Sequence, residues 1–116
     1  MNFLFVCTGN ISRSPAAEAL FRQMTNGRYG TRSAGIAPAC PRPLAEEDIR
    51  WADVVAVMEE EHHAFILGRW PDTAPKLRVL AIEDRYHRDH PRLLQLLEDK
   101  LGTLLAEIES GGMIGS

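Results

Sequence analysis

The segment from Val6 to Pro15 contains a cysteine and an arginine at a spacing suited to phosphate chemistry. Cys7 ends an apolar stretch, and Arg13 follows six residues later. Transfer of a phosphoryl group needs a nucleophile beneath phosphorus, backbone N–H groups around its oxygens and a planar cation that binds two of them. Cys7, the intervening loop and Arg13 would supply these three components.

The residues around this loop make the signal more specific than a cysteine and an arginine alone. A short apolar run precedes it, and Gly9 and Asn10 tolerate unusual backbone angles. Ser14-Pro15 predicts the cap and the first residue of a helix, whose N-terminus would favour an anion. The alternative interpretation, with Cys7 as a small core residue and Arg13 as a surface charge, fits this context poorly.

Apolar runs and helical periodicities alternate along the chain and predict the elements that position this loop. The expected strands lie at 3–6, 30–35, 54–58 and 77–80, and the expected helices at 15–25, at 44–51, from 59 onward and from 91 to 109. This order predicts an α/β doubly wound fold, with a mainly four-stranded parallel sheet flanked by helices and the first strand at its centre. Ligands of such sheets bind beyond the carboxyl ends of the strands, where Cys7 is placed.

Length and composition limit the domain organisation and the partners. The chain has 116 residues, 45% hydrophobic and 25% charged, which predicts one domain over residues 1–116, with 110–116 as a frayed tail. A net charge of −3 argues against nucleic acid as a partner. The apolar runs are too short for a membrane span, and two cysteines are too few for a disulfide framework, so we expect a cytoplasmic protein that binds no membrane. The oligomeric state is not indicated.

Residues 5–18, FVCTGNISRSPAAE, resemble the signature of the low-molecular-weight protein tyrosine phosphatases. RSAG at 32–35 is similar to the second strand of that family, WADVVAVM at 51–58 is similar to its third, and IEDRY at 82–86 falls where members carry an Asp-Pro-Tyr loop. A short phosphatase-like subgroup is closest in length. The resemblance implies a phosphatase that acts on phosphorylated proteins or small aryl phosphates and uses neither a metal nor another cofactor.

The same resemblance implies roles for individual residues. Cys7 would attack phosphorus and form a phosphocysteine, and Arg13 would bind the phosphate oxygens. Asp84 would act first as general acid and then as general base. Tyr86 would flank the aryl ring of the substrate. The phosphate-binding loop would consist of Thr8, Gly9, Asn10, Ile11, Ser12 and Arg13.

The resemblance also implies supporting contacts, and the residues themselves offer a rival acid. Ser14 would hydrogen-bond the thiolate, and Asn10 would brace the loop against Ser33. Asp89, which follows Asp84 in the same segment, is an alternative general acid or a helix cap.

Three departures from the family pattern leave the substrate open. Ser12 stands where many members have a second loop cysteine, so no disulfide between that position and Cys7 can form. Arg85 replaces the proline after the acid, His87 replaces a second aromatic residue, and the segment after residue 35 is short. The sequence therefore does not rank phosphotyrosine, phosphoarginine and small phosphate esters as substrates.

Two other functions share this loop chemistry. An arsenate reductase on the same scaffold would need further cysteines to resolve the Cys7 adduct, and the sequence offers Cys40 alone, in a proline-flanked loop. A non-catalytic phosphate-binding or phosphopeptide-binding module would keep Arg13 without a working acid.

The histidines and acidic residues after the third expected strand are interpreted as structural. His62 and His63 fall at a helix start, where solvated histidines are common, and they lack partners at metal-ligand spacing. Residues 59–61, all glutamate, suit a solvated face at the start of a helix. We therefore expect no metal site.

Overall fold

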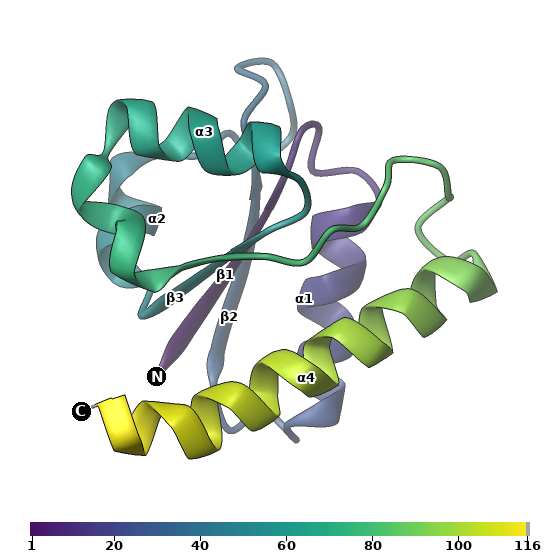
Figure 1. The fold of residues 1–116 in the computed structure, drawn as a ribbon. Coiled ribbons are helices and arrows are strands. Elements are labelled where there is room, and N and C mark those ends of the chain that lie inside the picture. Colours follow the sequence, from purple (N-terminus) through teal and green to yellow (C-terminus); the bar gives the residue numbers. More distant parts are fainter. Residues whose placement is uncertain (116) are drawn as a thin grey trace.

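In the computed structural model, four parallel strands form one sheet in the order β2-β1-β3-β4. The structure describes the backbone of residues 1–115 and the side chains of residues 1–110. The strands are β1 (Asn2–Cys7), β2 (Gly30–Gly35), β3 (Val54–Val57) and β4 (Leu77–Val79). The helices are α1 (Arg13–Met24), α2 (Glu46–Trp51), α3 (Glu60–Arg69), the 3₁₀ helix η1 (Pro71–Lys76) and α4 (Pro91–Gly115). The expected α/β fold, with β1 inside the sheet, is confirmed (Figure 1).

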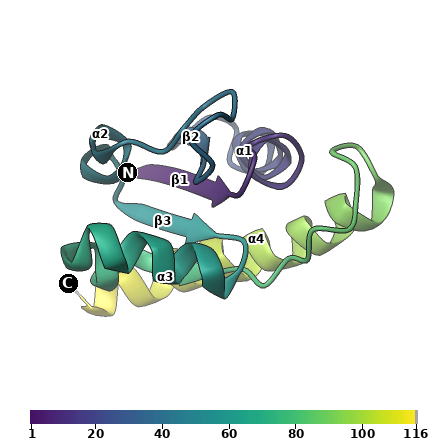
Figure 2. The same cartoon turned by 90° about the horizontal axis from the view of Figure 1, so that it is seen from above.

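Both faces of the sheet are buried, because successive side chains of a strand point to opposite faces. Phe3 and Phe5 of β1 pack in one cluster with residues of α1 and α4, and Leu4 and Val6 pack in another with residues of α2 and α3. Helices therefore cover the sheet on both sides (Figure 1 and Figure 2). This double burial explains why β1 and β3 are continuously apolar.

α1 begins two residues earlier than the sequence predicted, at Arg13 with Ser12 as its N-cap. Pro15 lies within the first turn, where it is tolerated because N–H groups in that turn have no partner inside the helix. Beyond the end of α1, Asn26 and Gly27 have φ of 52° and 71°, which agrees with the predicted stop at this pair.

α2 begins at Glu46 instead of residue 44, because the chain before it remains extended along β2. Gly35 forms an isolated bridge with Pro43, and the Leu44 N–H donates to the Gly35 carbonyl at 2.8 Å. The loop after β2 therefore returns to the end of its own strand, close to Cys7, which pairs with Gly35.

α4 carries the leucine stripe that the sequence predicted. Leu93, Leu97 and Leu101 are fully buried against the sheet. The backbone of the helix continues to Gly115, and Ser116 lies outside the described residues, so the frayed tail at 110–116 stays a prediction. A docked helix extends at small cost, since nucleation is the expensive step. No helix in the described part of the chain is long and apolar enough to cross a membrane.

The segments that follow the strands gather at the carboxyl edge of the sheet (Figure 1). Met58 N–H donates to the Val6 carbonyl at 3.0 Å, and Ile82 N–H donates to the Met58 carbonyl at 2.9 Å. These bonds bring the loop at 8–12, the start of α3 and the segment at 81–90 to one edge. Most of the expected site residues lie in or next to the loop at 8–12 and in the segment at 81–90.

Candidate active site

Cys7 lies at the carboxyl end of β1 and is only 3% exposed. Its Sγ lies 2.9 Å from Ser14 Oγ and accepts a hydrogen bond from the Asn10 N–H at 3.2 Å. Asn10 has a φ of 52°, in the left-handed region that asparagine tolerates better than most residues. The two contacts hold the sulfur at the base of the loop.

The side chain of Asn10 is anchored by Ser14, so the prediction that it braces the loop against Ser33 is wrong. Asn10 Nδ2 donates to Ser14 Oγ at 2.9 Å. Ser33, on β2, instead donates to Glu18 Oε1 of α1 at 2.7 Å. Because Ser14 Oγ accepts from Asn10, its own hydrogen is directed to Cys7 Sγ or, at 3.4 Å, to the Ala34 carbonyl.

The other N–H groups of the loop are available to an oxyanion. Within the part of the chain that the structure describes, the N–H groups of Thr8, Gly9, Ile11 and Ser12 donate to no protein acceptor. α1 begins directly after them. Unpaired N–H groups that lead into a helix N-terminus form a favourable site for a phosphate group.

Arg13 is 3% exposed and is fixed by one end of its guanidinium. Nη1 donates to Glu59 Oε1 at 2.6 Å and to the Ile82 carbonyl at 2.8 Å. Among the described residues, Nε and Nη2 donate no hydrogen bond, and the nearest charged partner of Nη2 is Asp84 Oδ2 at 3.9 Å. This second edge of the planar group can bind two phosphate oxygens.

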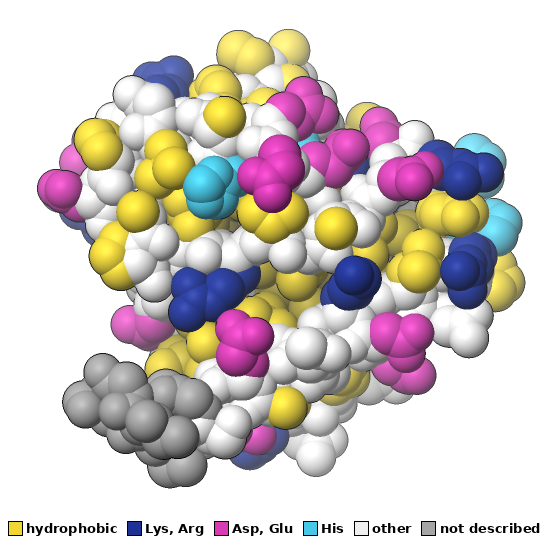
Figure 3. All heavy atoms as spheres, in the orientation of Figure 1, with side chains coloured by type: hydrophobic (Ala, Val, Ile, Leu, Met, Phe, Trp, Pro, Cys, Tyr) yellow, Lys and Arg dark blue, Asp and Glu magenta, His cyan; other side chains and the backbone are white. Residues whose placement is uncertain are grey.

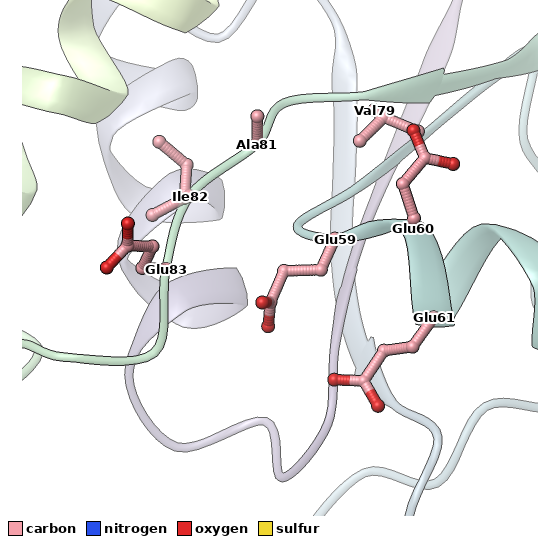
Figure 4. Close-up of a pocket in the computed structure, with 7 residues that line it drawn as sticks. All are labelled: Glu59, Glu60, Glu61, Val79, Ala81, Ile82 and Glu83. Carbon is pink, nitrogen blue, oxygen red and sulfur yellow. The ribbon is translucent and has the colours of Figure 1, made fainter.

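Glu59 is half-buried beside Arg13, whereas the sequence predicted a solvated helix face. Its carboxylate points away from the start of α3 into the space before the 81–83 segment (Figure 4). A cavity of about 480 Å³ opens here, lined by Glu59, Glu60, Glu61, Val79, Ala81, Ile82 and Glu83. Acidic side chains gather on the surface over the start of α3 (Figure 3). The surroundings of the loop are therefore acidic on this side.

His62 is fully buried, so the prediction of a solvated histidine is wrong at this position. Its Nε2 lies 2.9 Å from Thr8 Oγ1, and its Nδ1 accepts the Glu59 N–H at 3.0 Å. Burial, followed by the positive charge of Arg13, lowers the pKa of His62 below its ordinary value. The sequence signal for this role is the spacing of three residues from Glu59, at which a polar side chain can reach back to cap a helix start.

Glu59, Glu61 and His62 place one ligand atom each within 4.8 Å of one another. Both ring nitrogens of His62 are hydrogen-bonded, and Glu59 is paired with Arg13. His62 and Glu59 are therefore engaged in holding the loop, and the arrangement of the three groups does not assign a metal ion to the site.

The segment between β4 and α4 brings Asp84 to the site. Its side chain is 71% exposed, and one carboxylate oxygen is the 3.9 Å neighbour of Arg13. Asp89 is exposed and forms no ion pair with Arg13 within the described residues. Tyr86 is half-buried, and its ring centroid lies 5.0 Å from that of His90. Of the two candidate acids, the structure places Asp84 next to Arg13.

Known proteins are similar to this chain in sequence and in fold. A family model described as low molecular weight phosphotyrosine protein phosphatase matches residues 2–39. A protein-arginine-phosphatase of Bacillus subtilis (strain 168) is 34% identical, in a match that covers 62% of this chain and 67% of the relative. The chain belongs to the low molecular weight phosphotyrosine protein phosphatase family. It is a cysteine-dependent phosphatase.

Solved structures agree with this membership of the phosphatase family. YfkJ from Bacillus subtilis matches with a TM-score of 0.78 and 25% identity, over 96% of each chain. YwlE arginine phosphatase, as a mutant with a phosphorylated active-site serine, matches with a TM-score of 0.78 and 25% identity, over 95% of this chain and 97% of that one. The low molecular weight protein tyrosine phosphatase from T. tengcongensis matches with a TM-score of 0.72 and 26% identity, over 94% of this chain and 98% of that one. Relatives named as phosphatases favour phosphatase activity over the arsenate reductase alternative.

Proposed function

We propose that the protein hydrolyses phosphate monoesters through a phosphocysteine on Cys7. The observation that carries this proposal is the composition of the loop, in which a buried thiol lies at the base of four N–H groups without protein acceptors. The free edge of Arg13 adds the cation that such a site needs. Further support comes from the YwlE mutant, whose active-site serine is phosphorylated.

In the first step, the Cys7 thiolate would form a bond to phosphorus while the bond from phosphorus to the leaving oxygen breaks. The loop N–H groups and Arg13 would neutralise the charge on the transferring group. Asp84 would donate a proton to the leaving oxygen. Its position beside Arg13 Nη2 supports this assignment over Asp89.

In the second step, water would attack phosphorus and the bond between sulfur and phosphorus would break. Asp84, now ionised, would accept a proton from this water. Ser14 would donate a hydrogen bond to the returning thiolate, for which its Oγ is placed at 2.9 Å. Because the loop and Arg13 supply the positive charge at the phosphoryl group, we propose that no metal or other cofactor takes part.

We propose phosphorylated proteins with aryl phosphate groups as the substrate class. Ile11 is 66% exposed within the phosphate-binding loop, and the half-buried Tyr86 follows Asp84 by two residues. Apolar and aromatic surfaces of this kind suit the ring of a phosphorylated tyrosine. One observation favours a second substrate class: the Bacillus subtilis relative is a protein-arginine-phosphatase.

Turnover of p-nitrophenyl phosphate in the presence of a metal chelator tests the proposal. Reduced wild type should be active, Cys7→Ser should be inactive, and Cys40→Ser should match wild type. Arg13→Lys should lose about 10²-fold or more in kcat/KM, because a lysine cannot reproduce the planar fork. Phosphotyrosine and phosphoarginine peptides in the same assay would rank the two substrate classes. A reduced wild type without turnover would overturn the proposal.

A further inference from the structure

His62 lies outside the phosphate-binding loop and connects that loop to the start of α3. It is fully buried and contacts the loop through one nitrogen and its own helix start through the other. The proposed mechanism assigns it no step. Buried titratable groups with specific charged or polar partners are often found at functional sites.

The hydrogen bonds define the protonation of the ring. The Glu59 N–H donates to Nδ1 at 3.0 Å, so Nδ1 must be without a hydrogen. In the neutral ring, the hydrogen is then on Nε2, which donates to Thr8 Oγ1 at 2.9 Å. A protonated ring would carry hydrogen on both nitrogens and would lose the bond from Glu59.

The same helix start also holds Arg13. Glu59 donates its backbone N–H to His62 and accepts Arg13 Nη1 with its carboxylate at 2.6 Å. The segment from Glu59 to His62 therefore contacts the loop at both of its ends, Thr8 and Arg13.

We propose that neutral His62 is a positioning residue, which fixes Thr8 directly and Arg13 through Glu59 so that the loop is shaped for phosphate. This role rests on the proposed function, in which that loop binds the transferring group. Small displacements of such groups reduce rates strongly, because the geometry of attack is lost.

Charged groups from three parts of the fold face His62. Arg13 comes from α1, Asp84 comes from the segment before α4, and Glu59 and Glu61 belong to the start of α3. Burial and Arg13 lower the pKa of His62, whereas the three carboxylates act in the opposite direction. The net effect is a lowered pKa of His62, so the neutral ring is favoured near pH 7. Protonation of the ring would release the Glu59 backbone N–H only under more acidic conditions.

Three substitutions separate the two bonds of His62. His62→Asn places a carbonyl oxygen where Nδ1 accepts, and His62→Gln places an N–H group where Nε2 donates. His62→Leu removes both. At pH 7.5, His62→Leu should lose about tenfold or more in kcat/KM for p-nitrophenyl phosphate, and the two amide variants should fall between it and wild type. His63→Gln, on the neighbouring half-exposed histidine, should match wild type.

The pH profile separates positioning from a general loss of stability. Relative to wild type, His62→Asn should lose less kcat/KM between pH 7.5 and 5, because no ring remains to protonate. Nitrogen chemical shifts of the ring in folded wild type should report the Nε2-protonated tautomer at pH 7.5. A ring protonated on Nδ1 at this pH, or His62 variants that match His63→Gln, would overturn the role while Cys7→Ser still tests the proposed function. A wild type without turnover would overturn both.

Discussion

The guanidinium of Arg13 binds the protein through one nitrogen and leaves its other edge for the proposed substrate. One nitrogen is fixed by Glu59 and the Ile82 carbonyl, and the other edge makes no hydrogen bond within the described residues. This division orients the group before phosphate arrives, so less side-chain freedom is lost on binding. It also places a negative charge close to a site for anions, which has a measurable consequence.

Glu59→Gln should tighten the binding of inorganic phosphate. Glutamine keeps an oxygen that can accept the Arg13 hydrogen bond, but it removes the charge that repels the anion. Binding should strengthen by about two- to fivefold in calorimetric titrations, the size expected for one partly exposed charge. Glu98→Gln, on the exposed side of α4, serves as the control. Weaker binding in Glu59→Gln would mean that its charge mainly serves to orient Arg13.

Asp84→Asn should reduce turnover in a way that depends on the leaving group. An amide cannot donate the proton that a poor leaving group needs, so phenyl phosphate hydrolysis should fall by about 10²-fold or more. The loss should be smaller for p-nitrophenyl phosphate, whose leaving group is stable without a proton. Rates for a series of aryl phosphates would measure this dependence.

Asp89→Asn is the matched control for this experiment. Asp89 lies in the same exposed segment and has no ion pair with Arg13 in the described part of the chain. It should retain the rate and the leaving-group dependence of wild type. If Asp89→Asn shows the dependence and Asp84→Asn does not, the acid has been assigned to the wrong residue.

Residue types along the chain predicted the loop, but not all of its contacts. The roles of Cys7 and Arg13 could be predicted because a thiol and a guanidinium follow the end of an apolar strand at this spacing. The partners of Asn10 and His62 depend on which side chains meet once α1 and α3 are packed on the sheet. The hydrophobic periodicity of the sequence predicts that a residue lies near a helix start. It does not predict which side chain of another helix or strand that residue will contact.

At the scale of elements, burial decided what the sequence could predict. β1 and β3 are covered on both faces, so their apolar runs were clear signals. α1 begins two residues earlier than predicted and α2 two residues later. At α2, the bridge from Gly35 to Pro43 holds the preceding chain extended, and no local pattern predicts that contact.

Gly35→Ala should damage the loop through the end of β2. A Cβ at this position would lie 2.6 Å from the Thr8 carbonyl oxygen, 2.8 Å from Cys40 Sγ and 3.0 Å from the Asn10 nitrogen. Removing these overlaps would displace the loop backbone. We therefore expect kcat/KM to fall at least tenfold and the free energy of unfolding to fall by about 1–3 kcal/mol. Kinetics and urea unfolding would measure both.

Gly102→Ala provides the comparison for a glycine without such a neighbour. It lies inside α4, and nothing is within 4 Å of a Cβ placed there. The substitution should raise the free energy of unfolding by up to about 1 kcal/mol and leave kcat/KM unchanged. If Gly35→Ala behaved in the same way, the end of β2 would not constrain the loop.

At the scale of the whole molecule, the site depends on segments distant in sequence. The loop after β1 supplies the sulfur, α3 holds the loop, and the segment before α4 supplies the proposed acid. α4 then returns across the sheet, and Glu109 near its end contacts the turn between α1 and β2. Tyr29 Oη donates to Glu109 Oε2 at 2.7 Å, and Arg28 Nη1 lies 3.3 Å from the same oxygen.

This long-range contact should be visible in the titration of Tyr29. The hydrogen bond to Glu109, followed by burial, raises the pKa of Tyr29 above its ordinary value of 10.0. The unfolded chain releases this proton first, so the contribution of the bond to stability is complete below about pH 10 and is lost as the pH rises through the folded pKa. Glu109→Gln should shift ultraviolet titration of Tyr29, in a Tyr86→Phe background, to lower pH. Glu107→Gln, which pairs with Arg78 instead, should leave it unchanged. An unchanged titration in Glu109→Gln would show that this bond does not tie α4 to the turn in solution.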